Sequence, residues 1–293
     1  MGASTFVVGY TADRRGAEAV ALAASIAAGA PAELILAIVL PEHTPFDAHY
    51  PGTDHGYGTI LGDTVDRWAA EALALVPEGV PCRVVARSAA SEAEGLMQIA
   101  AEAGAETIVV GAQRRGITGR FTPGSVASAL LHSSPVPVAL APVGETDPER
   151  SQEGPSRITA FVGTRPGAAA VVRTAAAAAV RRNVPLRVVS LVELDLRADD
   201  DGARADLARE TEETVASVVA SLGVRADVVV AAADTAEEAV EALDWEPREI
   251  AVVGSSRLAR KRRLFLGSTA QRMLRALPVP LVVVPRGYKP PAP

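Results

Sequence analysis

The chain has 293 residues, of which 48% are apolar but only 4% are aromatic. This length allows two domains that each bury a core built from Ala, Val, Leu and Ile. The formal net charge of −6 argues against a general nucleic-acid-binding protein. The single cysteine, Cys82, excludes an intrachain disulfide and favours a reducing compartment. The first residues show no signal-peptide pattern, and no apolar run is long enough to span a bilayer. We therefore expect a cytoplasmic protein without membrane contact.

Apolar runs alternate with helical patterns along the first half of the chain. We expect strands at residues 6–10, 34–40, 82–86, 107–111 and 136–140, and helices at 17–30, 59–76, 91–103 and 125–132. Continuous apolar runs of this length are typical of strands that are buried on both faces. Ser91, with Glu94 three residues later, has the spacing of a capping box and marks a helix start. Strict alternation of strand and helix predicts a parallel sheet.

The second half repeats this layout after a segment rich in charge, Gly and Pro. Its expected strands are 158–162, 186–192, 226–231, 250–254 and 281–284, and its expected helices are 168–181, 205–221, 235–243 and 268–277. We therefore predict an α/β fold of two tandem, doubly wound, five-stranded parallel-sheet domains of Rossmann-like type. The predicted boundaries are 1–143 for the first domain, 144–156 for a linker and 157–293 for the second domain.

One sequence pattern occurs in both halves at a constant spacing of 143 residues. It places Gly111 onto Gly254, Gly124 onto Gly267 and Ser125 onto Ser268. A register kept over so many small residues indicates an internal duplication. The period is too long for a solenoid, so each copy should be a whole domain.

The repeated pattern also has the features of an anion site. An apolar strand ends in Gly111, an Arg-rich loop follows, and Gly124-Ser125 begins a helix. The first turn of a helix carries unpaired N–H groups and a partial positive charge, which attract a phosphate. In an open parallel sheet such a loop lies at the carboxyl ends of the strands, where ligands bind. The alternative is that Gly-Ser merely begins a helix and that Gly111 merely forms a turn.

Both halves of the chain resemble the universal stress protein family. The nucleotide motif of that family is Gly-x2-Gly-x9-Gly-(Ser/Thr), between the fourth strand and the fourth helix. The matching residues are Gly111, Gly124, Ser125 and Val126 in the first half, and Gly254, Gly267, Ser268 and Thr269 in the second. The resemblance implies that an adenine nucleotide, ATP or AMP, binds at this loop of a stress-response regulator. We expect no efficient catalysis, because the sequence supplies no placed general base or nucleophile.

The chain departs from the family pattern at two places. Arg114 and Arg257 stand where the motif has its second glycine. The family also carries an Asp just after its first strand, where this chain has Thr11, with Asp13 two residues further on. The family residue that meets the adenine corresponds to about Val39. Since the second half has no acidic residue at the matching place, we expect the first half to be the better nucleotide site.

The two arginines allow two interpretations. Arg114 and Arg257 could clamp a phosphate through bidentate hydrogen bonds. They could instead be solvated loop charges at sites that no longer bind nucleotide. Three functions therefore compete. The first is a nucleotide-binding regulator that acts on an unidentified protein partner. The second is a protein-interaction module without nucleotide, and the third is a slow ATP hydrolase.

The last strand of each half should join the two domains. In the universal stress protein family, which this chain resembles, domains associate through the fifth strand. Pairing of residues 136–140 with 281–284 would form an intramolecular pseudo-dimer and cover two exposed sheet edges. Whether two chains assemble further into a homodimer stays open.

Three further features suggest packing rather than chemistry. His43, His49 and His55 are residue types that bind metals, but the intervening Pro and Gly residues define no rigid geometry, so we expect no metal site. His132 should cap the carboxyl end of its helix. Trp245 should pack against the core.

Overall fold

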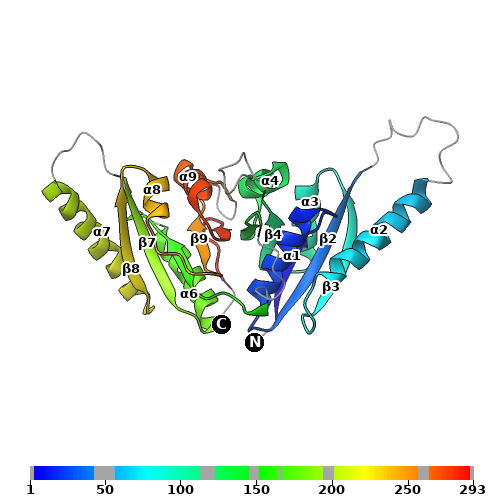
Figure 1. The fold of residues 1–293 in the computed structure, drawn as a ribbon, viewed down its shortest axis with the longest axis horizontal. Coiled ribbons are helices and arrows are strands. Elements are labelled where there is room, and N and C mark those ends of the chain that lie inside the picture. The colour runs from blue at the N-terminus through cyan, green and yellow to red at the C-terminus, as the bar shows by residue number, and fades with distance from the viewer. Residues whose placement is uncertain are drawn as a thin grey trace.

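The computed structural model describes residues 3–42, 57–112, 123–144, 152–164, 167–193, 201–256 and 264–290. Figure 1 shows two α/β halves side by side. In the first half the strands are β1 (Ser4–Gly9), β2 (Ala32–Pro41), β3 (Cys82–Ala89), β4 (Thr107–Gly111) and β5 (Val138–Ala141). Its helices are α1 (Arg14–Ala27), α2 (Tyr57–Ala74), α3 (Glu92–Glu102) and α4 (Ser125–Ser133).

The second half contains the same succession of elements. Its strands are β6 (Ile158–Phe161), β7 (Leu186–Glu193), β8 (Asp227–Ala233), β9 (Ile250–Gly254) and β10 (Leu281–Val284). Its helices are α6 (Ala168–Arg182), α7 (Asp201–Ser221), α8 (Ala236–Glu241) and α9 (Ser268–Ala276). The predicted alternation of strand and helix is therefore confirmed in both halves.

All ten of these strands form one sheet in the order β3-β2-β1-β4-β5-β10-β9-β6-β7-β8. Pairing is parallel within each half, which confirms two doubly wound five-stranded units. At the centre, β5 and β10 pair antiparallel, with Leu140 opposite Leu281 and Val138 opposite Val283. This pairing, which we call the seam, joins the halves through the strands that the sequence indicated. Each half thereby covers the sheet edge of the other.

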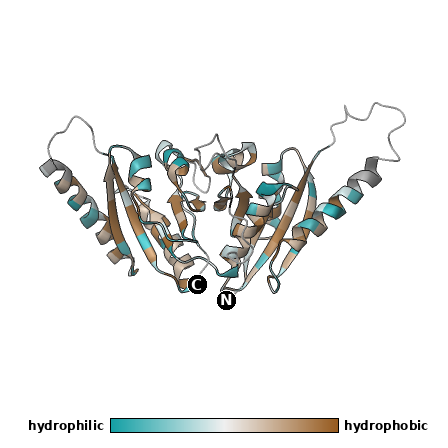
Figure 2. Ribbon diagram, viewed as in Figure 1, coloured by the Kyte–Doolittle hydropathy of each residue, from teal (hydrophilic) through white to brown (hydrophobic). Residues whose placement is uncertain are grey.

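The helices cover the sheet in two layers. One apolar cluster contains residues of α1, α2, α6 and α7, and a second contains residues of α3, α4, α8 and α9. The strands between them are mostly apolar, as Figure 2 shows, and the polar exceptions include Arg83 and Arg87 on the outer strand β3. Strands that are buried on both faces need this composition, which explains the continuous apolar runs in the sequence.

The start of α1 differs from the prediction. The helix begins at Arg14 rather than at residue 17, because Asp13 caps it. The Asp13 carboxylate accepts the backbone N–H groups of Arg15 (3.0 Å) and Gly16 (3.1 Å). The expected cap of α3 is confirmed, since Ser91 Oγ accepts the N–H of Glu94 at 3.2 Å. Acidic and hydroxyl side chains at the N-cap accept hydrogen bonds from first-turn N–H groups that have no acceptor within the helix.

Two of the packing predictions are confirmed as well. Trp245 packs against the second apolar cluster, and its Nε1 donates to the carbonyl of Val240 at 2.9 Å. His132 lies in the last turn of α4, with Nδ1 2.6 Å from the carbonyl oxygen of Ser128.

The described ranges contain neither a membrane-spanning helix nor a cluster of metal-binding side chains. None of the helices there is both long and apolar enough to cross a membrane. No group of three or more His, Cys, Asp or Glu side chains is placed there to hold a metal ion. His43, His49 and His55 lie outside the described residues.

Candidate functional site

A pocket lies at the carboxyl ends of β1 and β4 in the first half. Its lining residues are Gly9, Thr11, Arg15, Glu92, Val110, Gly111, Gly124, Ser125, Val126 and Ala127. We call it the first-half pocket. Five residues that the sequence analysis proposed thus share one pocket: Thr11, Gly111, Gly124, Ser125 and Val126. The first turns of α1, α3 and α4 all reach this pocket, because a parallel sheet gathers these helix starts at one edge.

The amino end of α4 supplies backbone donors to the first-half pocket. Its N-cap, Gly124, has no side chain that could accept from the first turn. The first backbone bond of the helix runs from the N–H of Ser128 to the carbonyl of Gly124 at 2.8 Å. The N–H groups of Ser125, Val126 and Ala127 precede it, so they have no acceptor within the helix. Together with the helix dipole they favour an anion in the pocket.

Gly111 allows α1 to approach the end of β4. A Cβ atom at this position would lie 2.4 Å from the backbone oxygen of Arg15 and 2.8 Å from its Cβ. A larger residue would therefore push the first turn of α1 away from the sheet. Gly111 therefore does more than allow a backbone turn, because the close approach that it permits determines where Arg15 lies.

Asp13 orients Arg15 as well as capping α1. Its Oδ2 accepts Arg15 Nε at 2.9 Å and Nη2 at 2.6 Å, while Thr11 Oγ1 donates to Oδ1 at 2.7 Å. Burial opposes ionisation of Asp13, but the hydrogen bonds from Thr11, Arg15 and the Gly16 backbone outweigh it and lower the pKa of the carboxyl. Both oxygens of Asp13 are therefore engaged, and the side chain that reaches the pocket from this turn is Arg15.

Glu92 adds a carboxyl to the same pocket. Burial raises its pKa, Arg15 acts in the opposite direction, and Asp13 raises it further. Sequence reasoning missed both Arg15 and Glu92. Each lies in the first turn of a helix that follows a strand of the parallel sheet, Arg15 after β1 and Glu92 after β3. Inspection of every such first turn for charged residues would have found them.

The remaining first-half candidates lie elsewhere. Val39 is in β2 and is not among the lining residues of the first-half pocket; it packs on α3, where a Cβ at Gly95 would lie 2.6 Å from Val39 Cγ1. Arg114 is outside the described residues, as is Arg257 in the second half. The two interpretations of these arginines therefore both stay open.

The second half repeats the helix start but not its surroundings. α9 begins at Ser268, followed by Thr269, and its N-cap Gly267 again makes no side-chain hydrogen bond. Gly254 ends β9 as Gly111 ends β4. The difference lies at the first helix of each half: α6 is capped by Gly167, which offers no side-chain acceptor, where α1 has Asp13.

The segment just before α9 makes contacts with the end of β9 and with α4. The Phe265 N–H donates to Ser255 Oγ at 2.8 Å, and the Ser256 N–H donates to the Phe265 carbonyl at 2.8 Å. The Phe265 ring also meets the His132 ring edge-on, with centroids 5.2 Å apart. The segment before α9 thus folds back onto the end of β9 and onto α4 of the other half.

The sheet order, the duplicated halves and the helix start after the fourth strand define a tandem doubly wound α/β protein. The family model described as "Universal stress protein family" matches residues 3–142 and again 156–285. The chain therefore belongs to the universal stress protein family, in a form with two tandem copies, which confirms the resemblance seen in the sequence.

Individual relatives match almost the whole chain. A universal stress protein of Mycobacterium tuberculosis strain H37Rv is 30% identical over 297 residues, covering 96% of this chain and 99% of that protein. A universal stress protein from Archaeoglobus fulgidus has a similar fold, with a TM-score of 0.65 and 16% identity, covering 98% of this chain and 100% of that one. A putative universal stress protein from Pseudomonas aeruginosa gives a TM-score of 0.56 at 16% identity, covering 96% and 92%. At these identities the two structures support the fold alone.

Proposed function

We propose that this universal stress protein is a stress-response regulator that binds an adenine nucleotide, ATP or AMP, in the first-half pocket. The observation that carries the proposal is the amino end of α4, which has no side-chain cap and whose residues Ser125, Val126 and Ala127 line that pocket together with Arg15. Backbone donors at a helix start and a guanidinium are the groups that bind phosphate best.

The roles within the pocket follow from its geometry. The phosphates lie against the first turn of α4, with the Ser125 hydroxyl as an added donor. Arg15, held by Asp13, approaches them from α1, and Gly111 allows that approach. Thr11, two residues past the end of β1, lines the same pocket and would contact the nucleoside. The second half has Gly167 where the first has Asp13, so its helix start at Ser268 and Thr269 binds nucleotide more weakly.

We further propose that nucleotide binding regulates contact with a protein partner in the cytoplasm, without efficient catalysis. Among the described lining residues Glu92 is the carboxyl group, and no hydrogen bond there links it to the Thr11 or Ser125 hydroxyl that it would have to activate as a base. The protein's domains are then 1–143 and 157–293, joined by 144–156.

One observation favours a second candidate, a protein-interaction module without nucleotide. The Glu92 carboxylate lines the same pocket as the helix start and would repel a phosphate when ionised. Mass spectrometry of the protein purified under native conditions separates the two candidates. A co-purified adenine nucleotide removes the second one.

Isothermal titration with ATP and with AMP tests the first proposal directly. Arg15→Gln should weaken binding about tenfold or more, since a hydrogen bond to a charged group contributes about 1.5–3 kcal/mol. Arg173→Gln, at an exposed position on α6, is the matched control and should bind like the wild type. Flat titrations of the wild type at millimolar ligand would end the proposal, and equal losses in both variants would remove Arg15 from it.

A further inference from the structure

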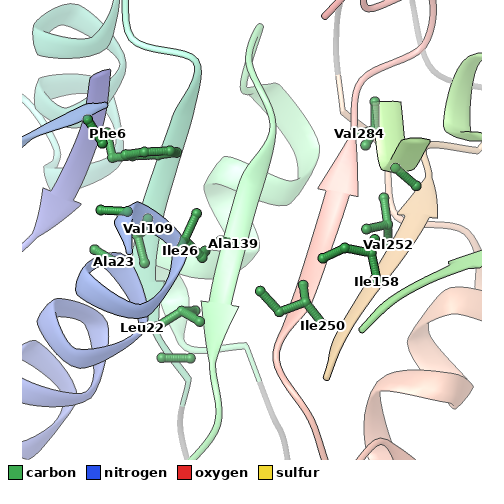
Figure 3. Packing of buried hydrophobic residues seen from close by; sticks show 14 of the residues in the cluster. Phe6, Leu22, Ala23, Ile26, Val109, Ala139, Ile158, Ile250, Val252 and Val284 are labelled. Atoms are coloured by element: carbon green, nitrogen blue, oxygen red, sulfur yellow. The ribbon is translucent and has the colours of Figure 1, made fainter. Parts of the chain in front are cut away.

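A second pocket lies where the two halves meet, on the face of the sheet that α1 and α6 cover. Its apolar lining comes from both halves and includes Phe6, Ile26, Ile158, Ile250, Val252 and Val282. Figure 3 shows Ile26 beside Ala139 on one side of the seam, with Ile158, Ile250 and Val252 on the other. We call this space the seam pocket. It is separate from the first-half pocket, with which it shares no lining residue.

Charged side chains of α6 and of the turn before β4 also line the seam pocket. Among the described lining residues these are two arginines, Arg181 and Arg182 from α6, and one carboxylate, Glu106 from the other half. Arg181 Nη2 lies 3.5 Å from Glu106 Oε2, and these two side chains are 20% and 17% exposed. The local charge balance of the pocket is therefore positive.

Within the described part of the chain, the Arg182 guanidinium donates to backbone carbonyls. Its Nε and Nη2 donate to the carbonyl of Ile26 at 2.9 and 2.5 Å, and its Nη1 donates to the carbonyl of Ala178 at 3.3 Å. Burial, and to a smaller extent the neighbouring Arg181, lower the pKa of this guanidinium to about 10, against the opposite effect of Glu106. A buried cation without its own carboxylate is stabilised by any anion that comes close.

Arg181 has a donor that the protein does not use. Its Nε is buried and makes no hydrogen bond to any of the residues that the structure describes. A buried donor left unpaired costs about 1–3 kcal/mol, so such groups usually mark a missing partner. An acceptor that also carries negative charge would satisfy the donor and the positive charge balance together.

We propose that the seam pocket binds a short-chain carboxylate, with its carboxylate group on Arg181 and its alkyl chain among the isoleucines of the two halves. A carboxylate matches the planar guanidinium with two oxygens, which a halide cannot do. The alkyl chain would be buried by Ile26, Ile158 and Ile250, at about 0.8 kcal/mol for each CH₂ group. Because the lining comes from both halves, the ligand would also hold them together.

Amide NMR spectra of the full chain, titrated with butyrate at constant ionic strength, test this site. We expect saturable shifts around Glu106, Thr107 and the end of α6. Butylammonium has the same chain with the opposite charge and should produce no saturable shift. Chloride should likewise fail, and acetate should bind more weakly because it lacks the chain. The absence of saturation with butyrate, or equal effects of chloride and butyrate, would overturn the proposal.

Variants locate the binding within the pocket. Arg181→Gln should weaken butyrate binding about tenfold or more, by loss of a charge-assisted hydrogen bond. Arg173→Gln, on the exposed side of the same helix, should change nothing. Unaltered binding in Arg181→Gln contradicts the assignment.

A second pair of variants keeps the test decisive if Arg181→Gln does not fold. Ala178→Leu fills the pocket without touching a charge and should abolish binding. Glu106→Gln removes the competing carboxylate and should tighten binding several-fold by removing its repulsion of the ligand and freeing Arg181. Unchanged affinity in both variants would place the ligand elsewhere.

Discussion

The guanidinium of Arg187, at the start of β7, lies 2.7 Å from the carboxylate of Glu249, which is completely buried before β9. Arg157 binds the other oxygen, Oε2, of the same carboxylate at 2.7 Å, and the Thr159 hydroxyl donates to Oε1, the oxygen that Arg187 binds. The residue at the equivalent place in the first half is Glu106, whose arginine partner Arg181 comes from the other half. Two equivalent glutamates of the duplicated halves thus have different partners. Glu249 forms its ion pairs within the second domain, whereas Glu106 of the first domain pairs with an arginine of the second.

The first prediction concerns this buried network. Glu249→Ala leaves the buried Arg187 without its carboxylate, whereas Arg157 keeps its ion pair with Glu246. Removing one partner of a buried ion pair costs about 3–5 kcal/mol. We expect a loss of this size in the free energy of unfolding, measured by urea denaturation followed by circular dichroism. Glu102→Ala, which breaks the exposed pair with Arg87, should leave the midpoint unchanged. A wild-type midpoint for Glu249→Ala would show that the network does not stabilise the fold.

The second prediction concerns the seam. Leu140 of β5 is fully buried opposite Leu281 of β10. Leu140→Ala should lower the free energy of unfolding by about 2–5 kcal/mol, because it leaves a cavity between the halves. Leu207→Ala, at a side chain that is 45% exposed, is the control and should have little effect. Because the seam continues one sheet through both halves, wild-type melting should be a single transition. Two separate transitions would show that the halves unfold independently.

The sequence predicted the strands better than the helix starts. The bounds of β4, β9 and β10 match because each is a continuous apolar run ended by a glycine or a proline. β3 runs on to Ala89, three residues past the prediction, because its register with β2 continues to the pair Pro41–Ala89. Such pairing depends on the partner strand and leaves little trace in the strand's own sequence.

The candidate site was predicted in part, for a similar reason. The glycines and Ser125 were found because duplication and motif spacing are visible along the chain. Arg15 and Glu92 were missed because only the folded sheet brings the first turns of α1 and α3 to the same pocket. Asp13 was selected as a ligand, but local hydrogen bonds with Thr11 and Arg15 use its two oxygens.

The third prediction concerns Asp13. Asp13→Ala removes the cap of α1 and should lower the free energy of unfolding by about 1 kcal/mol. The pKa of Asp13 is lowered in the folded state, so its carboxylate stabilises the fold at pH values above its ordinary pKa of 3.8 and loses this effect as the pH falls through the folded value. Asp13→Asn keeps a capping acceptor but should lack this acid-dependent part. Parallel pH profiles of wild type and Asp13→Asn, measured by chemical denaturation, would contradict the assignment.

The fourth prediction concerns Glu92. Its pKa is raised by burial above the ordinary 4.5, so the folded state binds this proton more tightly than the unfolded state does. Ionisation of Glu92 therefore costs stability as the pH rises from about 4.5 through the folded pKa. At neutral pH, Glu92→Gln should stabilise the protein slightly and tighten ATP binding several-fold, because it removes a negative charge beside the phosphates. Glu94→Gln, two residues further along α3 and outside the pocket lining, is the control, and titration calorimetry measures the affinity. Weaker ATP binding in Glu92→Gln would show that the carboxylate serves the ligand instead.

The proposed function depends on phosphate binding at the amino end of α4. Amide NMR spectra recorded during an ATP titration test this most directly, because they observe the N–H groups of Ser125, Val126 and Ala127 themselves. The equivalent amides of Ser268, Thr269 and Ala270 in the second half serve as an internal comparison. The account predicts saturable shifts at Ser125 to Ala127 at lower ATP concentrations than any shift in the second half. Unshifted amides at Ser125 to Ala127 in millimolar ATP would contradict it.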